Sequence, residues 1–429
     1  MKSTSTAVCT ARPSLALMKY WGKEDLGQGD PYTGRNIPAT PSLAVTLEGI
    51  ETRTEVSLFS TPAAPADPAA PELPTPPPAP NPGTSTPGGA ADSISINGTA
   101  QPVEQFRDFF NLLRRRFAAW RRENPRAFTI PDSQVPVFQA ESSNTFPTAA
   151  GLASSASGLA ALTGAAVAAL IRPELRPTWY TALVTQEGEL QNQIQTSLQA
   201  APGGSALEIL QTLSRDHLST PSWPAELTGL PDTLELSRIA RAGSGSASRS
   251  IFGGFTLFPP GAVQALPVAP PAFWPDFRIV LLRLTRDQKP LSSRQAMNRT
   301  RDTSPYYQAW LQDAPKQTDK AIQALLAADP AELGRLTQLS YLRMFSTMFS
   351  ADPPVVYWLP ASLQIIRLAQ DLRTRGLQVW ETMDAGPQVK LLTTAADLEE
   401  VLHGLSSALP AIEPVVCKPG RGLEFSHAS

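Results

Sequence analysis

The chain has 429 residues, of which 42% are hydrophobic and 17% charged, and its formal net charge is -2. This length exceeds that of a usual single domain, so two domains of ordinary size are expected. The near-neutral charge does not indicate a dedicated nucleic-acid binder, Cys9 and Cys417 are too few for a disulfide framework, and no stretch approaches the roughly 20 apolar residues that span a membrane. A reduced, cytoplasmic protein is therefore expected.

The first informative segment runs from Ser14 to Asp25, where an apolar, strand-like stretch ends in two lysines and two aromatic residues beside a glycine. Such a strand is suited to binding an anion, because Lys19 and Lys23 supply positive charge and Tyr20 supplies a hydroxyl donor. The alternative is that the lysines are ordinary solvated surface residues. Their density beside the aromatic residues favours the anion site.

Two strands are predicted between Arg35 and Ser60, because apolar and polar residues alternate in SLAVTL and again in TRTEVSLF. We expect them to form an antiparallel pair. The segment from Thr61 to Ala91 consists almost entirely of Pro, Ala, Gly, Thr and Ser, which cannot bury enough apolar surface to fold alone. It is predicted to be a disordered or polyproline-like excursion, after which Ser93 to Gly98 returns as a strand and turn.

A helix is predicted from Phe106 to Asn124, because its apolar residues recur at a helical spacing and can share one face. The same segment is rich in arginine, which could indicate RNA or an acidic partner. A solvated helix face is the preferred interpretation, since no second basic segment accompanies it.

The stretch from Glu141 to Gly158 contains two glycines and a run of Ala and Ser without bulky or charged side chains. A polyphosphate could approach such a backbone closely, and the Ala- and Leu-rich run that follows predicts a helix whose start is suited to anions. Ser154 and Ser155 favour this interpretation over a tightly packed Ala/Gly helix, because hydroxyl groups at a helix start can hold phosphate oxygens or magnesium. The stretch is not a Walker A loop, because it contains no lysine.

A further helix is predicted from Ala182 to Gln199, and a second small-residue segment lies between Leu236 and Phe255. In this segment Gly and Ser residues, including Ser244 and Ser246, lead directly to Arg249. One guanidinium among small residues is suited to bidentate recognition of a carboxylate or phosphate. A salt-bridging arginine at a helix packing point is the alternative.

The second half of the chain is predicted to open with a buried strand, Phe277 to Thr285. Helical patterns follow over Ser304 to Ala328, Pro330 to Phe349 and Ser362 to Gly376. The segment Leu377 to Thr393 predicts two strands joined by a small-residue turn, with Asp384 at the tip of the hairpin. Asp384 could simply cap the turn, or it could act as a general base positioned by two rigid strands.

Four motifs, taken in order, resemble the diphosphomevalonate decarboxylase family of the GHMP kinase superfamily: KYWGK, FPTAAGLASSASG, GSGSASRSIFGGF and MDAGPQVK. The resemblance covers nearly the whole chain and includes the stretches Lys289 to Tyr307 and Pro353 to Ser362. It implies a two-domain α+β GHMP kinase fold with the active site in the cleft between the domains. Residues 1–270 would form a ribosomal protein S5 domain 2-like ATP-binding domain with a Pro-rich insertion near 61–91, and residues 271–429 a ferredoxin-like GHMP domain.

The resemblance also implies an ATP-dependent carboxy-lyase of the mevalonate pathway of isoprenoid biosynthesis. Such an enzyme uses ATP and Mg2+ to phosphorylate the tertiary 3-hydroxyl of mevalonate 5-diphosphate, after which phosphate and carbon dioxide leave and isopentenyl diphosphate forms. The expected partners are therefore small molecules, without nucleic acid or membrane, and a homodimer is possible because relatives are often homodimers.

Three alternatives remain open. A phosphomevalonate decarboxylase would act on the monophosphate and make isopentenyl phosphate, and a mevalonate 3-kinase would phosphorylate without decarboxylating. A non-catalytic binding protein on a kinase-like scaffold is the third. The presence of both Tyr20 and Lys23 favours the diphosphate as substrate, and the presence of Asp384 and Arg249 favours decarboxylation.

The resemblance assigns catalytic roles to Asp384, Lys19 and Arg249. Asp384 would orient or deprotonate the 3-hydroxyl, Lys19 would lie close to that hydroxyl, and Arg249 would grip the substrate carboxylate. Ser244 and Ser246 would line the same pocket as Arg249.

The resemblance assigns the remaining roles to groups that bind phosphate. Tyr20 and Lys23 would clamp the diphosphate of the substrate. Gly151, Ser154 and Ser155 would belong to the loop that binds the phosphates of ATP. No metal ligands are assigned.

Three positions depart from the pattern of the family. Ser14 stands where Asn is usual, Gln388 follows DAGP in place of Asn, and Ser248 replaces a common Cys or Ala. The shorter side chain of Ser14 bears on the identity of the substrate more than on the fold. The segments 61–91 and 191–230 resemble insertions.

Overall fold

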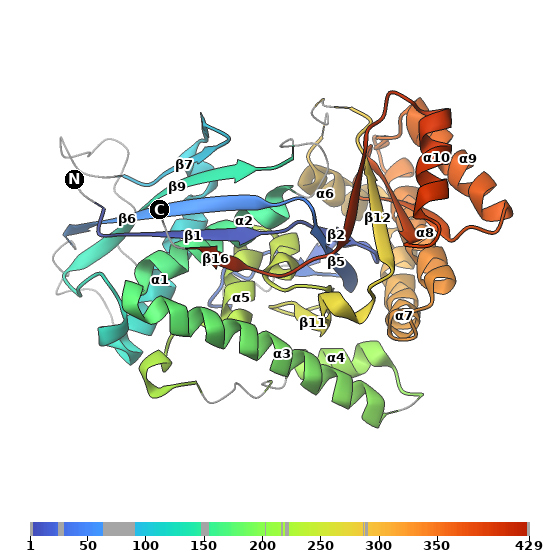
Figure 1. The fold of residues 1–429 in the computed structure, drawn as a ribbon. Coiled ribbons are helices and arrows are strands. Elements are labelled where there is room, and N and C mark those ends of the chain that lie inside the picture. Colours follow the sequence, from blue (N-terminus) through green and yellow to red (C-terminus); the bar gives the residue numbers. More distant parts are fainter. Residues whose placement is uncertain are drawn as a thin grey trace.

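The computed structural model describes residues 3–24, 30–62, 91–146, 154–201, 203–215, 218, 223–285, 287 and 291–426. These residues form an elongated molecule in which two sheets, with their helices, follow one another along the long axis (Figure 1). Two predictions fall outside the described residues. They are the Pro-rich excursion, at residues 63–90, and the centre of the small-residue loop, at residues 147–153.

The first sheet has the strand order β16-β1-β6-β9-β7-β8, and its neighbours are antiparallel except for the parallel pair β7 and β9. Its strands are β1 (Ser5–Ala11), β6 (Thr52–Pro62), β7 (Ser93–Ile96), β8 (Thr99–Ala100), β9 (Gln134–Asn144) and β16 (Glu424–Ser426). Helix α2 (Ser154–Leu170) packs against β1 and β6. Its small residues allow a close approach, since a Cβ added at Gly164 would lie 2.5 Å from Cys9 Sγ.

The second sheet draws strands from both halves of the chain. Its order is β11-β10-β5-β15-β12-β14-β13, and β2 pairs with β5 beside this path. The strands are β2 (Ser14–Ala16), β5 (Ser42–Glu48), β10 (Phe255–Phe258), β11 (Leu266–Ala269), β12 (Phe277–Leu282), β13 (Val379–Met383), β14 (Val389–Thr394) and β15 (Pro414–Pro419). Strand β15 connects the strands of the second half to those of the first, because it pairs with β5, with Lys418 opposite Glu48 and Pro419 opposite Leu47. The predicted boundary at 270/271 falls between β11 and β12.

The two strands predicted between Arg35 and Ser60 exist as β5 and β6, but the expected antiparallel pair is wrong. Strand β5 pairs with β2, β10 and β15 in the second sheet, whereas β6 pairs with β1 and β9 in the first. The chain passes from one sheet to the other at Gly49, whose φ of +104° lies in the left-handed region that favours glycine. Alternation of apolar residues identifies a strand but does not name its partner.

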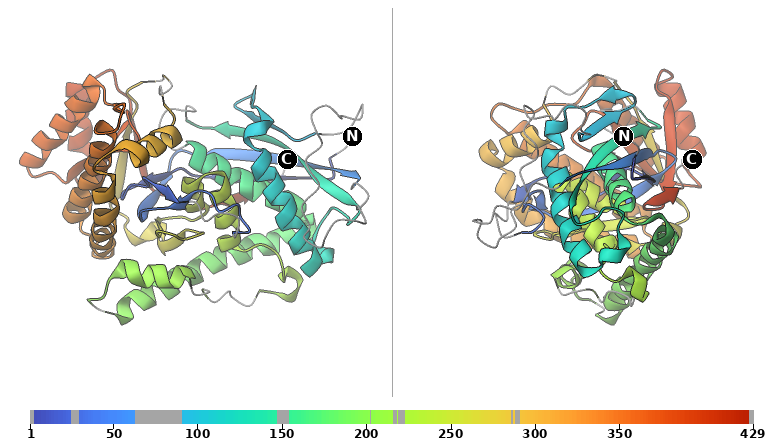
Figure 2. Two further views of the ribbon diagram at one scale, coloured as in Figure 1. Left: turned by 180° about the vertical axis from the view of Figure 1, so that it is seen from behind. Right: turned by 90° about the vertical axis from the view of Figure 1, so that its left-hand side faces the viewer.

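Helices pack against both sheets (Figure 2). In the first half these are α1 (Arg107–Glu123), α2, α3 (Arg176–Ala200), α4 (Ala206–Arg215) and α5 (Thr233–Gly243), followed by the 3-10 helix η6 (Gly245–Ile251). In the second half they are α6 (Ser293–Thr303), α7 (Tyr307–Leu326), α8 (Pro330–Phe349), α9 (Pro360–Thr374) and α10 (Leu398–Ala408). None of the described helices is long and apolar enough to cross a membrane.

Most of the predicted elements are confirmed. The helices predicted at 106–124, 182–199, 304–328, 330–349 and 362–376 correspond to α1, α3, α7, α8 and α9, although α3 begins earlier, at Arg176. Strand β12, the strand and turn at β7 and the β13–β14 hairpin also form as predicted. Helices α4, α5, α6 and α10 are additional.

The arginine-rich face of α1 is only partly solvated, which corrects the prediction. An Arg114 nitrogen lies 2.6 Å from an Asp92 carboxylate oxygen, and Arg116 Nε lies 2.7 Å from an oxygen of Glu235. The two arginine side chains are 13% and 24% exposed. These ion pairs join α1 to the start of β7 and to α5, so both arginines have a structural role.

Trp21 anchors the segment between β2 and β3 (Lys23–Glu24) in the second half of the molecule. Its side chain is buried in the core to which α6, α7 and α8 contribute. Trp21 Nε1 donates to Thr300 Oγ1 at 3.0 Å, and Trp310 Nε1 donates to the Trp21 carbonyl oxygen at 2.7 Å. The segment from Lys19 to Lys23 is therefore held by both halves of the molecule.

Candidate active site

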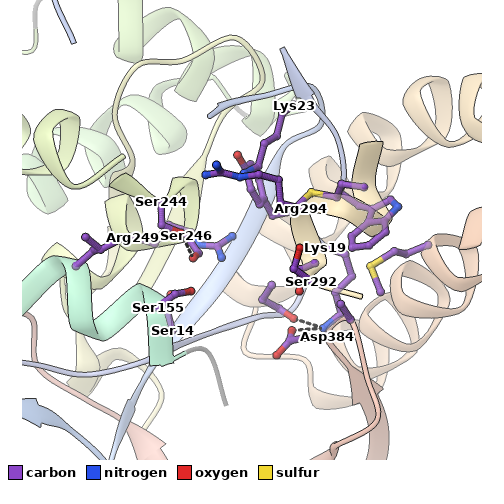
Figure 3. Close-up of a pocket in the computed structure, with 18 of the residues that line it drawn as sticks. Ser14, Lys19, Lys23, Ser155, Ser244, Ser246, Arg249, Ser292, Arg294 and Asp384 are labelled. Carbon is purple, nitrogen blue, oxygen red and sulfur yellow. Dashed lines mark hydrogen bonds and ion pairs between the residues drawn. The ribbon is translucent and has the colours of Figure 1, made fainter. Parts of the chain in front are cut away.

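A cavity of about 630 Å³ lies where the two halves meet (Figure 3). Its first-half lining comes from the segment after β2, the start of α2, the end of α5 and η6, and its second-half lining from α6, α8 and the β13–β14 turn. The polar lining residues are Ser14, Lys19, Tyr20, Lys23, Ser155, Ser244, Ser246, Ser292, Ser293, Arg249, Arg294 and Asp384. Positive groups outnumber negative ones among them, so the cavity is suited to an anionic ligand.

At one end of the cavity, Asp384 directly follows β13 and so begins the predicted hairpin turn rather than lying at its tip. Its Oδ1 accepts from Lys19 Nζ at 3.2 Å and its Oδ2 accepts from Lys390 Nζ at 2.9 Å. The two lysine side chains are 2% exposed, whereas the carboxylate is 29% exposed. The carboxylate is therefore held from two sides and is still reachable from the cavity.

Burial and the charges of Asp384, Lys19 and Lys390 together determine the electrostatics of this end of the cavity. Burial alone would raise the pKa of the Asp384 carboxyl, but Lys390 and Lys19 outweigh it and hold that pKa well below its usual range. Burial lowers the pKa of the Lys19 ammonium to about 8, against the opposing attraction of Asp384. Asp384 is consequently an anion at neutral pH, and Lys19 changes its protonation state close to physiological pH.

Arg249 extends from η6 toward the middle of the cavity (Figure 3). One guanidinium nitrogen, Nη1, donates to Ser42 Oγ, while Nε has no hydrogen-bond partner among the described residues. No described carboxylate forms an ion pair with Arg249, which contrasts with the salt-bridging alternative. Burial lowers the pKa of Arg249 to about 10, partly offset by Asp384. A buried guanidinium with an unused donor is suited to bind a carboxylate or phosphate.

Small hydroxyl residues surround Arg249. Ser244 Oγ and Ser246 Oγ lie 3.1 Å apart on the cavity wall. Ser250 Oγ donates to Ser14 Oγ at 3.2 Å, so Ser14 is buried beside η6 and contributes to the lining. The serine in place of Asn therefore leaves its hydroxyl at the edge of the same pocket.

At the other end of the cavity, Lys23 lies near Arg294 of α6 (Figure 3). Burial, together with repulsion from Arg294, lowers the pKa of Lys23 to about 8. Lys23 Nζ donates to Asn36 Oδ1 at 2.7 Å, and the Tyr20 hydroxyl donates to the Asn36 carbonyl oxygen at 2.9 Å. Asn36 itself has a φ of +61° and donates through Nδ2 to the Arg241 carbonyl oxygen, so it links both side chains to α5.

The predicted ATP loop is described only in part. Ser155 is exposed at the start of α2 and lines the cavity. Ser154 begins the helix, and Gly151 lies outside the described residues. Among the described residues no cluster of three His, Cys, Asp or Glu side chains could hold a metal ion.

Two functional candidates were not singled out by sequence reasoning. Arg294 sits in the first turn of α6, which begins with a capping box between Ser292 and Gln295; that pattern was visible in the sequence. Lys390 is the second residue of the buried strand β14, where a charged residue is unusual unless it is paired. The side chain of Gln388 does not line the cavity; its Oε1 accepts from the Leu284 backbone N–H at 2.5 Å. Its departure from the family's Asn is therefore accommodated by a backbone contact.

Comparison with known proteins finds one family of relatives over nearly the whole chain. The family described as the diphosphomevalonate decarboxylase-like N-terminal domain matches residues 84–183 and 225–265, and the mevalonate 5-diphosphate decarboxylase C-terminal domain matches residues 279–419. A diphosphomevalonate decarboxylase of Ganoderma lucidum is 27% identical over 424 residues, covering 96% of this chain and 84% of the relative. The diphosphomevalonate decarboxylase of Saccharomyces cerevisiae is 26% identical and covers 90% of this chain and 77% of the relative.

Solved structures show the same similarity. The mevalonate diphosphate decarboxylase from Enterococcus faecalis, described for its mevalonate diphosphate mediated ATP binding mechanism, is 28% identical with a TM-score of 0.65, and the match covers 99% of each chain. The structure of MDDEF in complex with MVAPP, AMPPCP and magnesium is 28% identical with a TM-score of 0.66 and also covers 99% of each chain.

The fold and the cavity between its halves define a two-domain α+β protein of the GHMP kinase type, as the sequence predicted. Both halves of the chain match the corresponding domains of one group of decarboxylases. The chain belongs to the diphosphomevalonate decarboxylase family.

Proposed function

We propose that this protein is an ATP-dependent decarboxylase that converts mevalonate 5-diphosphate to isopentenyl diphosphate. One observation carries the proposal. A single cavity holds Asp384 with Lys19 at one end, Arg249 in the middle, and Lys23 with Arg294 at the other end. A substrate with a hydroxyl, a carboxylate and a diphosphate has one group for each of these positions.

The assignment of substrate groups follows from charge. Lys23 and Arg294 would bind the diphosphate, since two cations match its charge better than a monophosphate's, and the Tyr20 hydroxyl would join them by donating to phosphate in place of Asn36. Arg249 would bind the carboxylate through donors that have no carboxylate partner among the described side chains, with Ser244 and Ser246 beside it. The 3-hydroxyl would then lie at Asp384.

The acidity of Asp384 bears on its role. A carboxylate whose pKa lies well below the usual range is a weak base, so it would not remove the proton of a free tertiary alcohol. It would accept a hydrogen bond from the 3-hydroxyl and orient it, and it would take the proton as the new O–P bond forms and the hydroxyl becomes more acidic. Lys19 Nζ lies 3.2 Å from Asp384 Oδ1 and would stabilise the negative charge on this carboxylate oxygen.

The chemistry after phosphorylation depends on the carboxylate at Arg249. ATP supplies the phosphoryl group that turns a poor leaving group into a good one. The C–O bond to phosphate then breaks, and the electrons of the bond to the carboxylate carbon form the new double bond as carbon dioxide leaves. The carboxylate loses its charge as carbon dioxide forms, and Arg249 would hold it in the orientation from which that bond breaks.

The ATP and magnesium requirements are part of the proposal. The lining hydroxyl of Ser155, at the start of α2, supports a phosphate site there, and we assign Gly151 and Ser154 to the same loop. Magnesium commonly binds through nucleotide phosphates with few protein ligands, which fits a described chain without an acidic or histidine cluster. The free, buried thiols of Cys9 and Cys417 support a cytoplasmic location.

Product analysis tests the proposal. The purified protein is incubated with ATP, magnesium and, separately, mevalonate, its 5-phosphate and its 5-diphosphate, and ADP and carbon dioxide are measured. We expect equal amounts of both products with the diphosphate. A preference for the monophosphate would make the protein a phosphomevalonate decarboxylase, and ADP without carbon dioxide would make it a kinase. Silence with all three substrates would refute an enzymatic function of this class.

A further inference from the structure

Lys390 occupies an unusual position for a charged residue. It lies in β14, opposite Leu281 of β12 and Thr382 of β13, and is 2% exposed. Its neighbours in the strand, Val389 and Leu391, are fully buried. Burying an ammonium group is costly unless it is paired, and a Leu or Val would satisfy the sheet better. The charge of Lys390 must therefore be explained by the groups that it contacts.

One contact of Lys390 is the carboxylate that the proposed function places at the reacting hydroxyl. Lys390 Nζ lies 2.9 Å from Asp384 Oδ2, while Lys19 Nζ lies 3.2 Å from Oδ1. Lys390 comes from β14, which follows the turn in the sequence, and Lys19 comes from the segment after β2. Each carboxylate oxygen thus has its own cationic donor.

One lysine would already neutralise the carboxylate, so the second gives the group an excess positive charge. Lys19 also donates to the Ala16 carbonyl oxygen at 2.6 Å and lines the cavity, whereas Lys390 is absent from the cavity lining. Arg249 adds a third cation that acts on Asp384 from η6. Of the charged groups that face Asp384 among the described residues, Lys390 is the one that does not line the cavity.

We infer that Lys390 is a positioning residue for the proposed reaction, acting through Asp384. Its ion pair with Oδ2 holds the carboxylate from the side away from the cavity, so that Lys19 can direct its charge toward the substrate oxygen as negative charge develops there. It also fixes Oδ2, so that Oδ1 faces the hydroxyl. The inference rests on the proposed function for the identity of the substrate, but the pairing of Lys390 with Asp384 stands on geometry alone.

The principal test replaces Lys390 by methionine, which has a similar length and no charge. We expect kcat to fall by about 10- to 100-fold, as when an orienting partner of a functional group is removed. The KM for mevalonate 5-diphosphate should change less than about threefold, because Lys390 does not contact the substrate. K390R should recover part of kcat, since it keeps the charge. The matched control is K418M, an exposed lysine on β15 of the same sheet, which should behave as wild type.

A pH profile separates this role from a merely structural one. The folded pKa of Asp384 is lowered, so the carboxylate protonates only when the pH falls through that low value. Without Lys390 this pKa rises, and the acid limb of the kcat profile should move to higher pH in K390M but remain in place in K390R and K418M. In a D384N background, K390M should cause less than about a twofold further loss of residual kcat, because the two residues act as a unit.

A measurement without turnover keeps the inference independent of the substrate assignment. Carbon-13 labelling of aspartate, with D384N used to assign the signal, reports the Asp384 carboxyl titration directly by NMR. A higher titration midpoint in K390M supports the pairing even where the decarboxylase assay fails, in which case only the proposed function is lost. A folded K390M with wild-type kcat and an unmoved acid limb would overturn the inference. If K390M does not fold, K390R decides in its place: its midpoint must match wild type, and a midpoint shifted upward refutes the role of the charge.

Discussion

The pairing of one carboxylate with two buried lysines makes a sharp prediction for Asp384→Asn. The substitution keeps the size of the side chain but removes its negative charge, leaving two ammonium groups that are each 2% exposed without their counter-ion. Removing one member of a buried ion pair costs about 3–5 kcal/mol. Asp384 is itself 29% exposed to a polar cavity, so we expect the free energy of unfolding to fall by less, about 2–3 kcal/mol.

The same reasoning predicts opposite effects on turnover and on binding. Turnover should fall by about 10³-fold or more, because no group remains to orient the hydroxyl and take its proton. The affinity for mevalonate 5-diphosphate should be unchanged or higher, since the cavity becomes more positive. Burial lowers the pKa of Lys19 to about 8, so in D384N the Lys19 ammonium can lose its proton and its charge. The loss of stability should therefore shrink as the pH rises from 6 to 9.

Denaturant unfolding, calorimetric titration with mevalonate 5-diphosphate and an ADP-release assay measure the three quantities. Asp397→Asn is a suitable control, because Asp397 is an acidic residue of the same half that lies outside the cavity and accepts from the Thr394 hydroxyl at 2.9 Å. It should leave binding and turnover intact. Wild-type turnover in D384N, or a marked loss of affinity for the substrate, would refute the placement of Asp384 beside the hydroxyl.

Three further predictions concern the remaining cations. Arg249→Leu should raise the KM for the substrate and lower kcat, because both the bound carboxylate and its orientation depend on the guanidinium; an unchanged steady-state profile would remove Arg249 from the site. At saturating substrate, where the bound diphosphate keeps Lys23 charged, kcat should decline as the pH rises through about 8 because Lys19 loses its proton, and Lys19→Arg should move that alkaline limb upward. Lys23→Met and Arg294→Met should each raise the KM for the diphosphate more than for the monophosphate, and equal effects on the two substrates would place the diphosphate elsewhere.

Local sequence patterns were sufficient for the helices and for the turn that carries Asp384. Helix α8 matches its prediction from Pro330 to Phe349 because Asp329 caps its start and the apolar residues keep one face. Helix α6 was harder to predict, since SRQAMNRTRDT buries only Ala296, Met297 and Thr300. Its signal was the capping box rather than periodicity.

Features that depend on distant parts of the chain could not be derived from local patterns. The partners of β5 lie as far away as β10 and β15, and nothing in SLAVTL identifies them. Resemblance to a family assigned Asp384, Lys19 and Arg249, but it did not indicate that Lys390 closes the other side of the carboxylate. A lysine inside VKLLTT was visible in the sequence, and only the fold shows which acid it meets.

The sheet shared by both halves has a practical consequence for anyone who cuts the chain at 270/271. A fragment ending there keeps β5 but loses β15, and a fragment beginning there keeps β15 but loses β5, so each presents a row of unpaired backbone groups. The first fragment also lacks β16, which pairs with β1. Such edges are templates for aggregation, and the separated halves should be insoluble alone yet recover when they are produced together. The two domains can be described separately, but the strands that they share require them to be expressed, and to evolve, together.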